Sequence, residues 1–388
     1  MSSRKNKPFL NLVLVLVSIA VALLLLELAA GFYITRLASQ EQFDKFASYS
    51  QLVERYGKPS LSKHRFLGYY LTPSWVREPD KHNSLGYRGE EVVVPKPDGV
   101  YRIVAIGGST TYGGGVDDYR QAYPYLLQQY LNERGYENVE VVNAGVGGYR
   151  TWESLINLQF RVLDLEPDLI IIYHAINDIA PRLVWPPSEY RGDLSGYLDP
   201  PLIFRPSLIE RSNLARMVMI SLDLTQPAIA LSRTWAPRTE FSYEALFEEQ
   251  RSEGTYPQGI FLEVSAQEML RQNPPIYFER NLRSMVAIAR ANGIEVILAT
   301  FVYSPDFKYV QVSSPEYQSA LAEHNDVIRL ITASTEAHLF DFASLMPTNE
   351  KYFTDGVHFT FEGNQLRANL FADFIIESGF LDGITVLD

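Results

Sequence analysis

The segment Ile103-Val-Ala-Ile-Gly-Gly-Ser-Thr-Thr-Tyr-Gly113 decides the fold that we expect for this chain. Four apolar residues, Ile103 to Ile106, end at two glycines, and Ser109 follows at once. A short apolar run bounded by glycines is typical of a buried parallel strand that ends in a tight turn. If a helix follows, Ser109 lies at its positive end, where free N–H groups stabilise a developing negative charge. Taken alone, such a segment is more often a turn without chemistry, so the rest of the chain decides its meaning.

The composition excludes several classes of function. The chain has 388 residues, of which 46% are hydrophobic, and can bury one large core or two smaller ones. Its net charge of −12 argues against binding of nucleic acid, because no basic face is available to displace counterions. There is no cysteine, so neither disulfides nor thiolate metal sites can form.

The N-terminal region is apolar enough to enter a membrane. Nineteen uncharged residues separate Lys7 from Glu27, which corresponds to about 28 Å of helix and spans the hydrocarbon core. Glu27 then falls at the far interface rather than in the middle of the bilayer. We expect a basic cytoplasmic tail at 1–8, a transmembrane signal anchor at 9–34 and the remainder of the chain outside the cytoplasm.

A cleaved signal peptide is the alternative for this region. Leu12–Leu26 matches the apolar part of such a peptide, and Leu28-Ala29-Ala30 is a possible cleavage site, although leucine fits poorly there. Both interpretations predict that the bulk of the chain is exported.

Residues 35–97 form a stalk and N-terminal extension in this interpretation. Aromatic and charged residues alternate over 37–65 and indicate a membrane-proximal helix, which either holds the next domain at the surface or only packs on it. Residues 66–98 contain several prolines and glycines and are expected to form loops.

A regular alternation of strands and helices begins at Tyr101. Expected strands are 103–106, 139–142, 169–173, 294–301 and 338–342, and expected helices are 123–134, 152–163, 281–292, 319–334 and 362–377. This alternation predicts a three-layer α/β/α sandwich over 98–388, of the flavodoxin-like kind, with a mostly parallel sheet covered on both faces. Ligands bind such sheets at the carboxyl ends of the strands, where Ser109, Gly148 and Asn177 all fall.

Residues 180–278 interrupt this alternation. They are rich in proline and aromatic residues and carry weak helical patterns at 208–220 and 243–250. A segment of this length between two sheet elements is a lid or a small subdomain. Its aromatic residues either line a substrate cleft or pack the insertion onto the sheet.

A second chemical motif, Asp355-Gly-Val-His358, lies near the C-terminus. An aspartate three residues before a histidine, in a turn that contains glycine, can bring the carboxylate to the imidazole. The carboxylate then fixes the tautomer and supports the protonated ring. Combined with Ser109, the motif supplies a nucleophile, a base and a group that orients the base.

These segments together resemble the SGNH (GDSL-type) hydrolase family. Gly107-Gly-Ser-Thr-Thr111 resembles its first block, Asn143-Ala-Gly-Val-Gly-Gly148 its second, Ile176-Asn-Asp178 its third and Asp355-Gly-Val-His358 its last. The resemblance covers about 98–178 and 280–378. It implies a Ser109, Asp355 and His358 triad, and an oxyanion hole formed by the N–H groups of Ser109 and Gly148 and the side-chain amide of Asn177.

Two positions depart from the family pattern. Gly108 stands where an aspartate is usual, and Ala175 stands where a glycine is usual two residues before Asn177. We expect neither change to abolish activity, because the aspartate is mainly structural and alanine is small. His174 could alter the site, although a structural role is the preferred interpretation.

The resemblance implies a serine esterase that needs no metal or organic cofactor. Its expected substrate is an acylated small molecule, envelope glycan or lipid, cleaved through an acyl-enzyme on Ser109. Two alternatives remain: an O-acetyltransferase that uses the same triad, and a non-catalytic binding or assembly subunit on the same fold.

Overall fold

The computed structural model describes residues 7–198, 211–229 and 240–384. Contacts divide the chain into two compact units. The larger unit comprises Ser60–Pro200 and Trp235–Asp388, and the smaller unit comprises Met1–Pro59 and Pro201–Thr234. These boundaries differ from those expected from the sequence, because residues 60–97 group with the sheet and part of the expected 180–278 insertion groups with the N-terminal region.

The larger unit is built on a five-stranded parallel sheet with the strand order β6-β5-β7-β8-β9. The strands are β5 (Tyr101–Gly107), β6 (Val139–Asn143), β7 (Leu169–Tyr173), β8 (Glu295–Ala299) and β9 (His338–Phe340). This is the flavodoxin-like order, so the predicted fold class is confirmed. Since β6 and β7 lie on opposite sides of β5, the order changes direction at β5, where ligands of such sheets bind.

Alternate residues of each strand pack into different cores. Ile103 and Ala105 of β5 join one hydrophobic cluster, and Val104 and Ile106 join the other. The central strand β7 is buried along its whole length, as expected for a parallel strand covered on both faces. The sequence of the sheet therefore specifies a sandwich rather than a half-exposed sheet.

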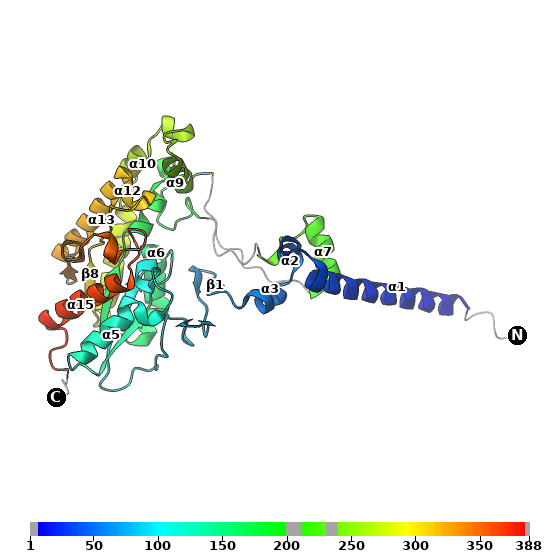
Figure 1. The fold of residues 1–388 in the computed structure, drawn as a ribbon, viewed down its shortest axis with the longest axis horizontal. Helices are drawn as coiled ribbons and strands as arrows, with labels where there is room; N and C mark the ends of the chain where they lie inside the picture. The colour runs from blue at the N-terminus through cyan, green and yellow to red at the C-terminus, as the bar shows by residue number, and fades with distance from the viewer. Residues whose placement is uncertain (1–6, 199–210, 230–239, 385–388) are drawn as a thin grey trace. The chain divides into compact units, whose positions relative to one another are not determined.

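Helices cover both faces of this sheet (Figure 1). The cluster that contains Ile103 includes residues of α5 (Tyr123–Glu133) and α15 (Phe361–Glu377), and the other includes residues of α11 (Ile276–Ala291). The described residues of this unit also form α4 (Ser109–Tyr112), α6 (Thr151–Asn157), α9 (Glu244–Glu253), α10 (Ala266–Gln272), α12 (Val310–Ser313), α13 (Pro315–Ser334) and α14 (Phe342–Leu345). The expected strands and helices of the sandwich are all present, and the largest differences are at the ends of helices.

The segment expected to form loops contains two small antiparallel hairpins. One pairs β1 (Leu61–His64) with β2 (Gly68–Leu71), and the other pairs β3 (Val76–Arg77) with β4 (Asp80–Lys81). Tyr69 of β2 is buried in a cluster with Tyr149, which follows β6. The first hairpin therefore packs against a segment that carries a predicted site residue.

The helices below lie in the described residues of the smaller unit. They are α1 (Lys7–Phe32), a π-helical turn at Tyr33–Leu37, α2 (Gln40–Phe46), α3 (Tyr49–Tyr56) and α7 (Asn213–Ser221). Serine side chains cap α2, α3 and α7 at their N-termini and so fix the residue at which each helix begins. A small core contains Ile34, Phe43 and Leu52, with Met217 of α7 packed against it. The expected helix at 208–220 thus begins at Asn213, and 208–210 lie outside the described residues.

One helix of the described chain, Phe9–Leu37, is long and apolar enough to cross a membrane. Its apolar side chains are exposed almost throughout. A helix with apolar residues on all sides is stable only where an apolar environment surrounds it. This helix is therefore a candidate membrane span.

Candidate functional site

Ser109 is the first residue of the short helix α4, directly after strand β5. Gly108 precedes it as the N-cap, and Gly113 ends the helix in a left-handed conformation with φ of 101°. Ser109 itself is partly exposed, whereas its neighbours Thr110 and Thr111 are buried. The strand–turn–helix geometry therefore presents the Ser109 hydroxyl at the carboxyl edge of the sheet.

The structure brings Ser109, His358 and Asp355 together. The Nε2 atom of His358 lies 2.7 Å from the Ser109 hydroxyl, and its Nδ1 atom lies 2.7 Å from Oδ2 of Asp355. The other carboxylate oxygen of Asp355 accepts the backbone N–H groups of Val357 and His358, at 2.9 and 2.8 Å. These two hydrogen bonds fix one carboxylate oxygen, and the other oxygen then faces the His358 ring.

The charge of Asp355 is stabilised in place. Burial raises the pKa of its carboxyl group, but the hydrogen bonds from the His358 ring and from the backbone outweigh burial and leave the pKa below its usual value. Asp355 is thus an anion beside the imidazole. An anion there favours the tautomer with a proton on Nδ1, and Nε2 can then accept the hydroxyl proton of Ser109.

The glycine run after Ser109 lets the chain pass close to the imidazole. A Cβ atom on Gly114 would lie 2.8 Å from Cδ2 of His358 and 3.4 Å from Cβ of Ser109. A contact of 2.8 Å is too close for any side chain, so the loop requires glycine at this position. The backbone at Gly114 therefore packs directly against the side chains of Ser109 and His358.

Two of the predicted oxyanion residues, Gly148 and Asn177, follow the two strands adjacent to β5. Gly148 follows β6 in the left-handed region with φ of 78°, and Asn177 follows β7 in a short 3₁₀ turn. The side-chain amide of Asn177 donates to the Tyr149 carbonyl at 2.9 Å. A Cβ atom on Gly108 would lie 2.7 Å from this amide nitrogen, which places Asn177 directly beside the residue that precedes Ser109.

Sequence reasoning missed two tyrosines that hold the loop carrying Gly148. The Tyr69 hydroxyl donates to the Gly147 carbonyl at 2.7 Å, and the Tyr149 hydroxyl donates to the Tyr69 carbonyl at 2.5 Å. The available signal was the aromatic pair Tyr69-Tyr70 in an otherwise loop-like segment, which by itself does not indicate a contact eighty residues away.

Two buried arginines, also missed, brace the helix that carries Ser109. The Arg88 guanidinium donates to the carbonyls of Tyr112 and Gly113 at 2.6 and 3.1 Å and pairs with Asp80 at 2.8 Å. From the opposite side, Arg367 donates to the Thr110 carbonyl at 2.7 Å. Both cations bind backbone carbonyls of α4 and of the glycine that ends it, and this fixes the position of Ser109.

Arg367 is enclosed by aromatic rings. It is completely buried, and its guanidinium lies 3.7 Å from the ring centroid of Tyr123 and 4.2 Å from that of Tyr173. Burial lowers the pKa of Arg367, although the group remains a cation at neutral pH. Stacking on aromatic faces compensates part of the cost of burying this charge.

His174 has the structural role that was preferred from the sequence. It is buried, and its Nε2 atom lies 2.8 Å from the Ser154 hydroxyl. Burial lowers the pKa of His174 to about 3, so the ring is neutral. Burial also raises the pKa of Asp178 to about 7. Hydrogen bonds from the Thr151 hydroxyl and backbone N–H lower this pKa, but burial has the larger effect. Both residues are buried and bind residues of α6.

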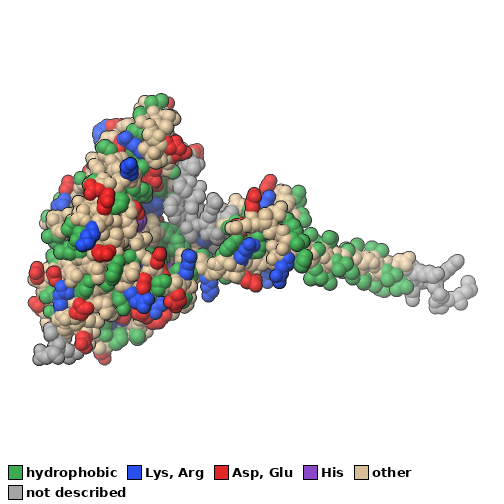
Figure 2. Space-filling model, in the orientation of Figure 1, with side chains coloured by type: hydrophobic (Ala, Val, Ile, Leu, Met, Phe, Trp, Pro, Cys, Tyr) green, Lys and Arg blue, Asp and Glu red, His purple; other side chains and the backbone are tan. Residues whose placement is uncertain are grey.

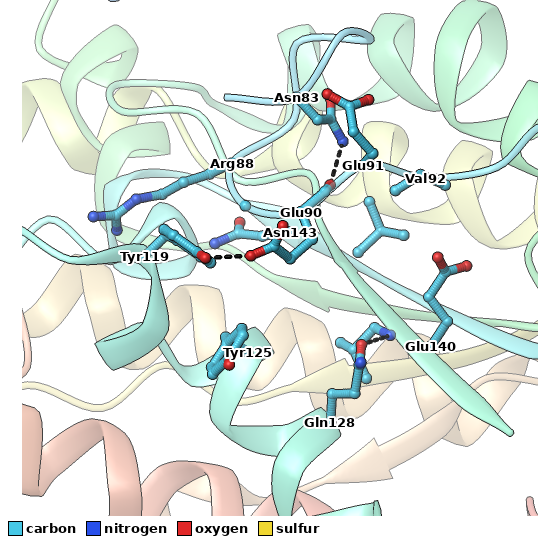
Figure 3. Close-up of a pocket in the computed structure, with 13 residues that line it drawn as sticks. Asn83, Arg88, Glu90, Glu91, Val92, Tyr119, Tyr125, Gln128, Glu140 and Asn143 are labelled. Atoms are coloured by element: carbon cyan, nitrogen blue, oxygen red, sulfur yellow. Dashed lines mark hydrogen bonds between the residues drawn. The ribbon is translucent and has the colours of Figure 1, made fainter. Parts of the chain in front are cut away.

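A separate pocket lies beside the edge strand β6 (Figure 3). It is formed by the segment 83–92, by residues of α5 and by the end of β6, and encloses about 140 Å³. Its polar groups bind one another: Asn83 donates to the Glu90 carbonyl, and the Tyr119 hydroxyl donates to the Glu90 carboxylate. The pocket contains none of the predicted site residues. In 7–198, 211–229 and 240–384, no three histidine or acidic side chains gather into a metal site.

A comparison with protein families agrees with this geometry. Residues 105–220 match the model of the GDSL-like Lipase/Acylhydrolase family. This part of the chain, less than half of its length, is therefore similar to that family. The match contains Ser109, Gly148 and Asn177, and ends before the turn with Asp355 and His358. The match thus agrees with the first three of the four blocks in the resemblance, and the last block lies outside it.

Individual relatives are more distant. The chain is 36% identical over 80 residues to the uncharacterized lipoprotein YqeF of Bacillus subtilis, which is 20% of this chain and 32% of that protein. The chain thus spans about a third of the length of this curated relative. A lipase/acylhydrolase structure from Enterococcus faecalis aligns over 72% of this chain and 97% of its own, with a TM-score of 0.41 and 19% identity. An acetyl xylan esterase, AlAXEase, aligns over 71% and 99%, with a TM-score of 0.40 and 14% identity.

Proposed function

We propose that this protein is a serine esterase that removes an acyl group from an alcohol through an acyl-enzyme on Ser109. The observation that carries the proposal is the continuous chain of contacts from Ser109 through His358 to Asp355, with both links at 2.7 Å. Nucleophile, base and orienting carboxylate within hydrogen-bond reach are the requirement for this reaction.

In the first half of the reaction, His358 Nε2 takes the proton of the Ser109 hydroxyl as the oxygen attacks the ester carbonyl. The carbonyl oxygen becomes an oxyanion, which the N–H groups of Ser109 and Gly148 and the Asn177 amide stabilise. Each such donor is worth about 3–4 kcal/mol of transition-state stabilisation in comparable sites. The protonated His358 then gives its proton to the leaving alcohol as the C–O bond breaks, and the acyl group stays on Ser109.

In the second half, His358 takes a proton from water, and the resulting hydroxide attacks the acyl carbon. The oxyanion forms in the same position, and collapse releases the carboxylic acid while the proton returns to the Ser109 oxygen. If a sugar hydroxyl replaces water, the same steps transfer the acyl group instead of hydrolysing it. An O-acetyltransferase is therefore the second candidate function, separated from the first only by the acceptor.

We propose further that the protein acts outside the cytoplasm on an acylated envelope glycan or lipid, and that the apolar helix within Phe9–Leu37 anchors it. The helix is long enough to span a bilayer. Basic residues Arg4, Lys5 and Lys7 precede it, which favours a cytoplasmic N-terminus. The relative named as a lipoprotein also supports attachment to a membrane.

The test is hydrolysis of a short-chain aryl ester by the full chain in detergent, beside the Ser109→Ala variant. The proposal predicts release of the aryl alcohol only by the protein that has Ser109. Inclusion of an envelope glycan as acceptor distinguishes the two candidates, because a transferase would move the acyl group to the glycan whereas an esterase would release the free acid. A well-folded protein that does neither would support the non-catalytic alternative.

A further inference from the structure

The acidic residue within the apolar N-terminal helix is bound by a second helix from the insertion. One carboxylate oxygen of Glu27 accepts the backbone N–H and the side-chain amide of Asn213, at 2.7 and 3.0 Å. The other accepts the backbone N–H of Leu214 at 2.9 Å and the Ser212 hydroxyl. Glu27 therefore binds the N-terminus of α7, where the free N–H groups and the helix dipole favour a negative charge.

Close packing of the two helices depends on small residues of α1. A Cβ atom on Gly31 would lie 3.1 Å from the amide nitrogen of Asn213, and Ala30 beside it is buried. One turn separates Gly31 from Glu27 on the helix, so both lie on the same face. The start of α7 is thus held on α1 by hydrogen bonds to the Glu27 carboxylate and, one turn later, by close contact of Asn213 with Gly31.

The single charged residue of α7 faces away from the apolar helix surface. Arg216 is buried; its guanidinium donates to the Phe46 carbonyl at 2.7 Å and to the side-chain oxygens of Gln51 and Asn213 at 3.0 and 2.8 Å. These partners lie in α2, α3 and α7 itself. The polar groups of α7 are therefore bound within the smaller unit, and no charge of α7 has to face an apolar solvent.

The large exposed side chains of α7 and of the residues after it are apolar, with Ser221 and Asp223 exposed among them. Val218 is 47% exposed, and Leu222 and Leu224, which follow the helix, are 63% and 68% exposed. An apolar groove lies between the two helices and is lined by Leu23 and Leu24 of α1 and by Leu214, Ala215, Val218 and Met219 of α7. Figure 2 shows hydrophobic side chains that cover α1 and continue onto the adjoining part of α7.

The direction of α7 takes this surface toward the membrane. Its first residues contact Glu27, whereas Val218 and Met219 line the groove beside Leu23 and Leu24. Leu23 and Leu24 belong to the uncharged run that is expected to span the bilayer, one turn deeper than Glu27. From its start at Glu27, α7 therefore runs back along the apolar part of α1.

We propose that α7 and the residues that follow it, 213–224, form a second membrane-contacting element, which enters the acyl boundary of a lipid bilayer while docked on α1 through Glu27. The proposed partner is the lipid surface itself. Leucine, valine and methionine side chains bury favourably at this depth. Glu27 is tolerated there because its oxygens are bound by the N-terminus of α7, and the unbound charge would be expelled.

The absence of cysteine from the chain makes a direct test possible. Single cysteines are introduced in the full chain as Leu222→Cys, as Leu16→Cys within α1 and as Leu262→Cys, and each is labelled with an environment-sensitive fluorophore. Leu262 is 72% exposed in the larger unit and is the matched control for an exposed leucine outside the proposed contact. The proteins are reconstituted into phosphatidylcholine vesicles with and without brominated acyl chains, which quench only fluorophores in the apolar layer.

The proposal predicts that the labels at positions 16 and 222 lose most of their emission in brominated vesicles, whereas the label at position 262 keeps its emission. A label at 222 that is as unquenched as the one at 262, beside a quenched label at 16, would overturn the proposal, since the apolar face would then serve a protein partner. Absence of quenching at 16 would overturn it as well, because α1 itself would not be in the bilayer.

A second variant tests the docking through Glu27. Glu27→Ala removes the acceptor that binds the start of α7, so quenching at 222 should fall while quenching at 16 stays unchanged. Glu27→Gln keeps one oxygen acceptor and should retain part of the quenching at 222. Full quenching at 222 in the Glu27→Ala protein would contradict docking on α1. The inference rests on the proposed membrane anchor, which the label at 16 tests by itself. None of the readouts depends on esterase activity, so a failure of the proposed esterase reaction would not affect them.

Discussion

Tyr69 and Tyr149 each bind the backbone of the segment that carries the other. The Tyr69 hydroxyl donates to the carbonyl of Gly147, and the Tyr149 hydroxyl donates to the carbonyl of Tyr69, with ring centroids 5.4 Å apart. A hairpin outside the sandwich thereby holds the loop that contains Gly148. An oxyanion donor must be placed to within a fraction of an ångström, so with Gly148 in its proposed role we expect this contact to affect catalysis.

We predict that Tyr69→Phe lowers kcat about tenfold with little change in KM, because a hydrogen bond worth about 1 kcal/mol that positions the loop is lost while the ring remains. Tyr70→Phe, one residue away on the same hairpin, is the control. Steady-state kinetics with an aryl ester compare the two. Equal kcat values in both variants would remove Tyr69 from any role in the site.

A methyl group on Gly108 should disturb the oxyanion amide. Its Cβ atom would lie 2.7 Å from Nδ2 of Asn177, so the amide has to move, and loss of one donor costs about 10²–10³ in kcat. Gly147→Ala is the matched control, because a Cβ atom there meets no atom closer than Cβ of Ser109 at 4.0 Å. Undiminished kcat in Gly108→Ala would contradict the role assigned to Asn177.

Asp355→Asn keeps the size of the side chain but removes its charge. The neutral amide no longer supports a protonated imidazole and can favour the wrong tautomer of His358, so kcat should fall by about 10³–10⁴ while the fold is retained. Asp306→Asn, an exposed change on a neighbouring loop, should leave kcat unchanged. If Asp355→Asn keeps about a tenth or more of the native kcat, another group must orient the imidazole.

The buried His174 should make stability depend on pH. Because its pKa is lowered to about 3 in the folded protein, its contribution is fully present above the unfolded value near 6.5 and is lost as the pH falls from there toward 3. Unfolding in urea at pH 7 and pH 5 is compared for the native chain and His174→Gln. The stability advantage of the native chain should shrink at pH 5 by up to about 2 kcal/mol. An advantage of equal size at both pH values would mean that folding does not lower the pKa of His174.

The sandwich could be predicted from sequence because its signals are local. The run Leu169–Tyr173 is apolar on both faces, which only a covered parallel strand satisfies, and it forms β7 with these limits. The approach of Ser109, Gly148 and Asn177 followed from the same argument, since residues after adjacent parallel strands share one edge. The contact between Asp355 and His358 was also local, because it spans a single turn.

The supporting contacts could not be predicted in this way. Tyr69 and Gly147 are separated by 78 residues, and nothing in the hairpin sequence indicates its partner. Arg367 lies on an amphipathic helix, where an arginine normally faces solvent, yet it is buried against Thr110. The pairing of Glu27 with Asn213 has the same cause: the sequence shows an acid in an apolar helix and a helix within an insertion, but no periodicity relates the two.

The proposed reaction requires Ser109 to carry the acyl group. The most direct test is the pre-steady-state reaction of the full chain with an aryl acetate, quenched and analysed by peptide mass spectrometry. We predict a burst of about one aryl alcohol per chain and an acetyl group on the peptide that contains Ser109. Turnover that persists in Ser109→Ala, or an acetyl group on a different residue of the native chain, would contradict the assignment.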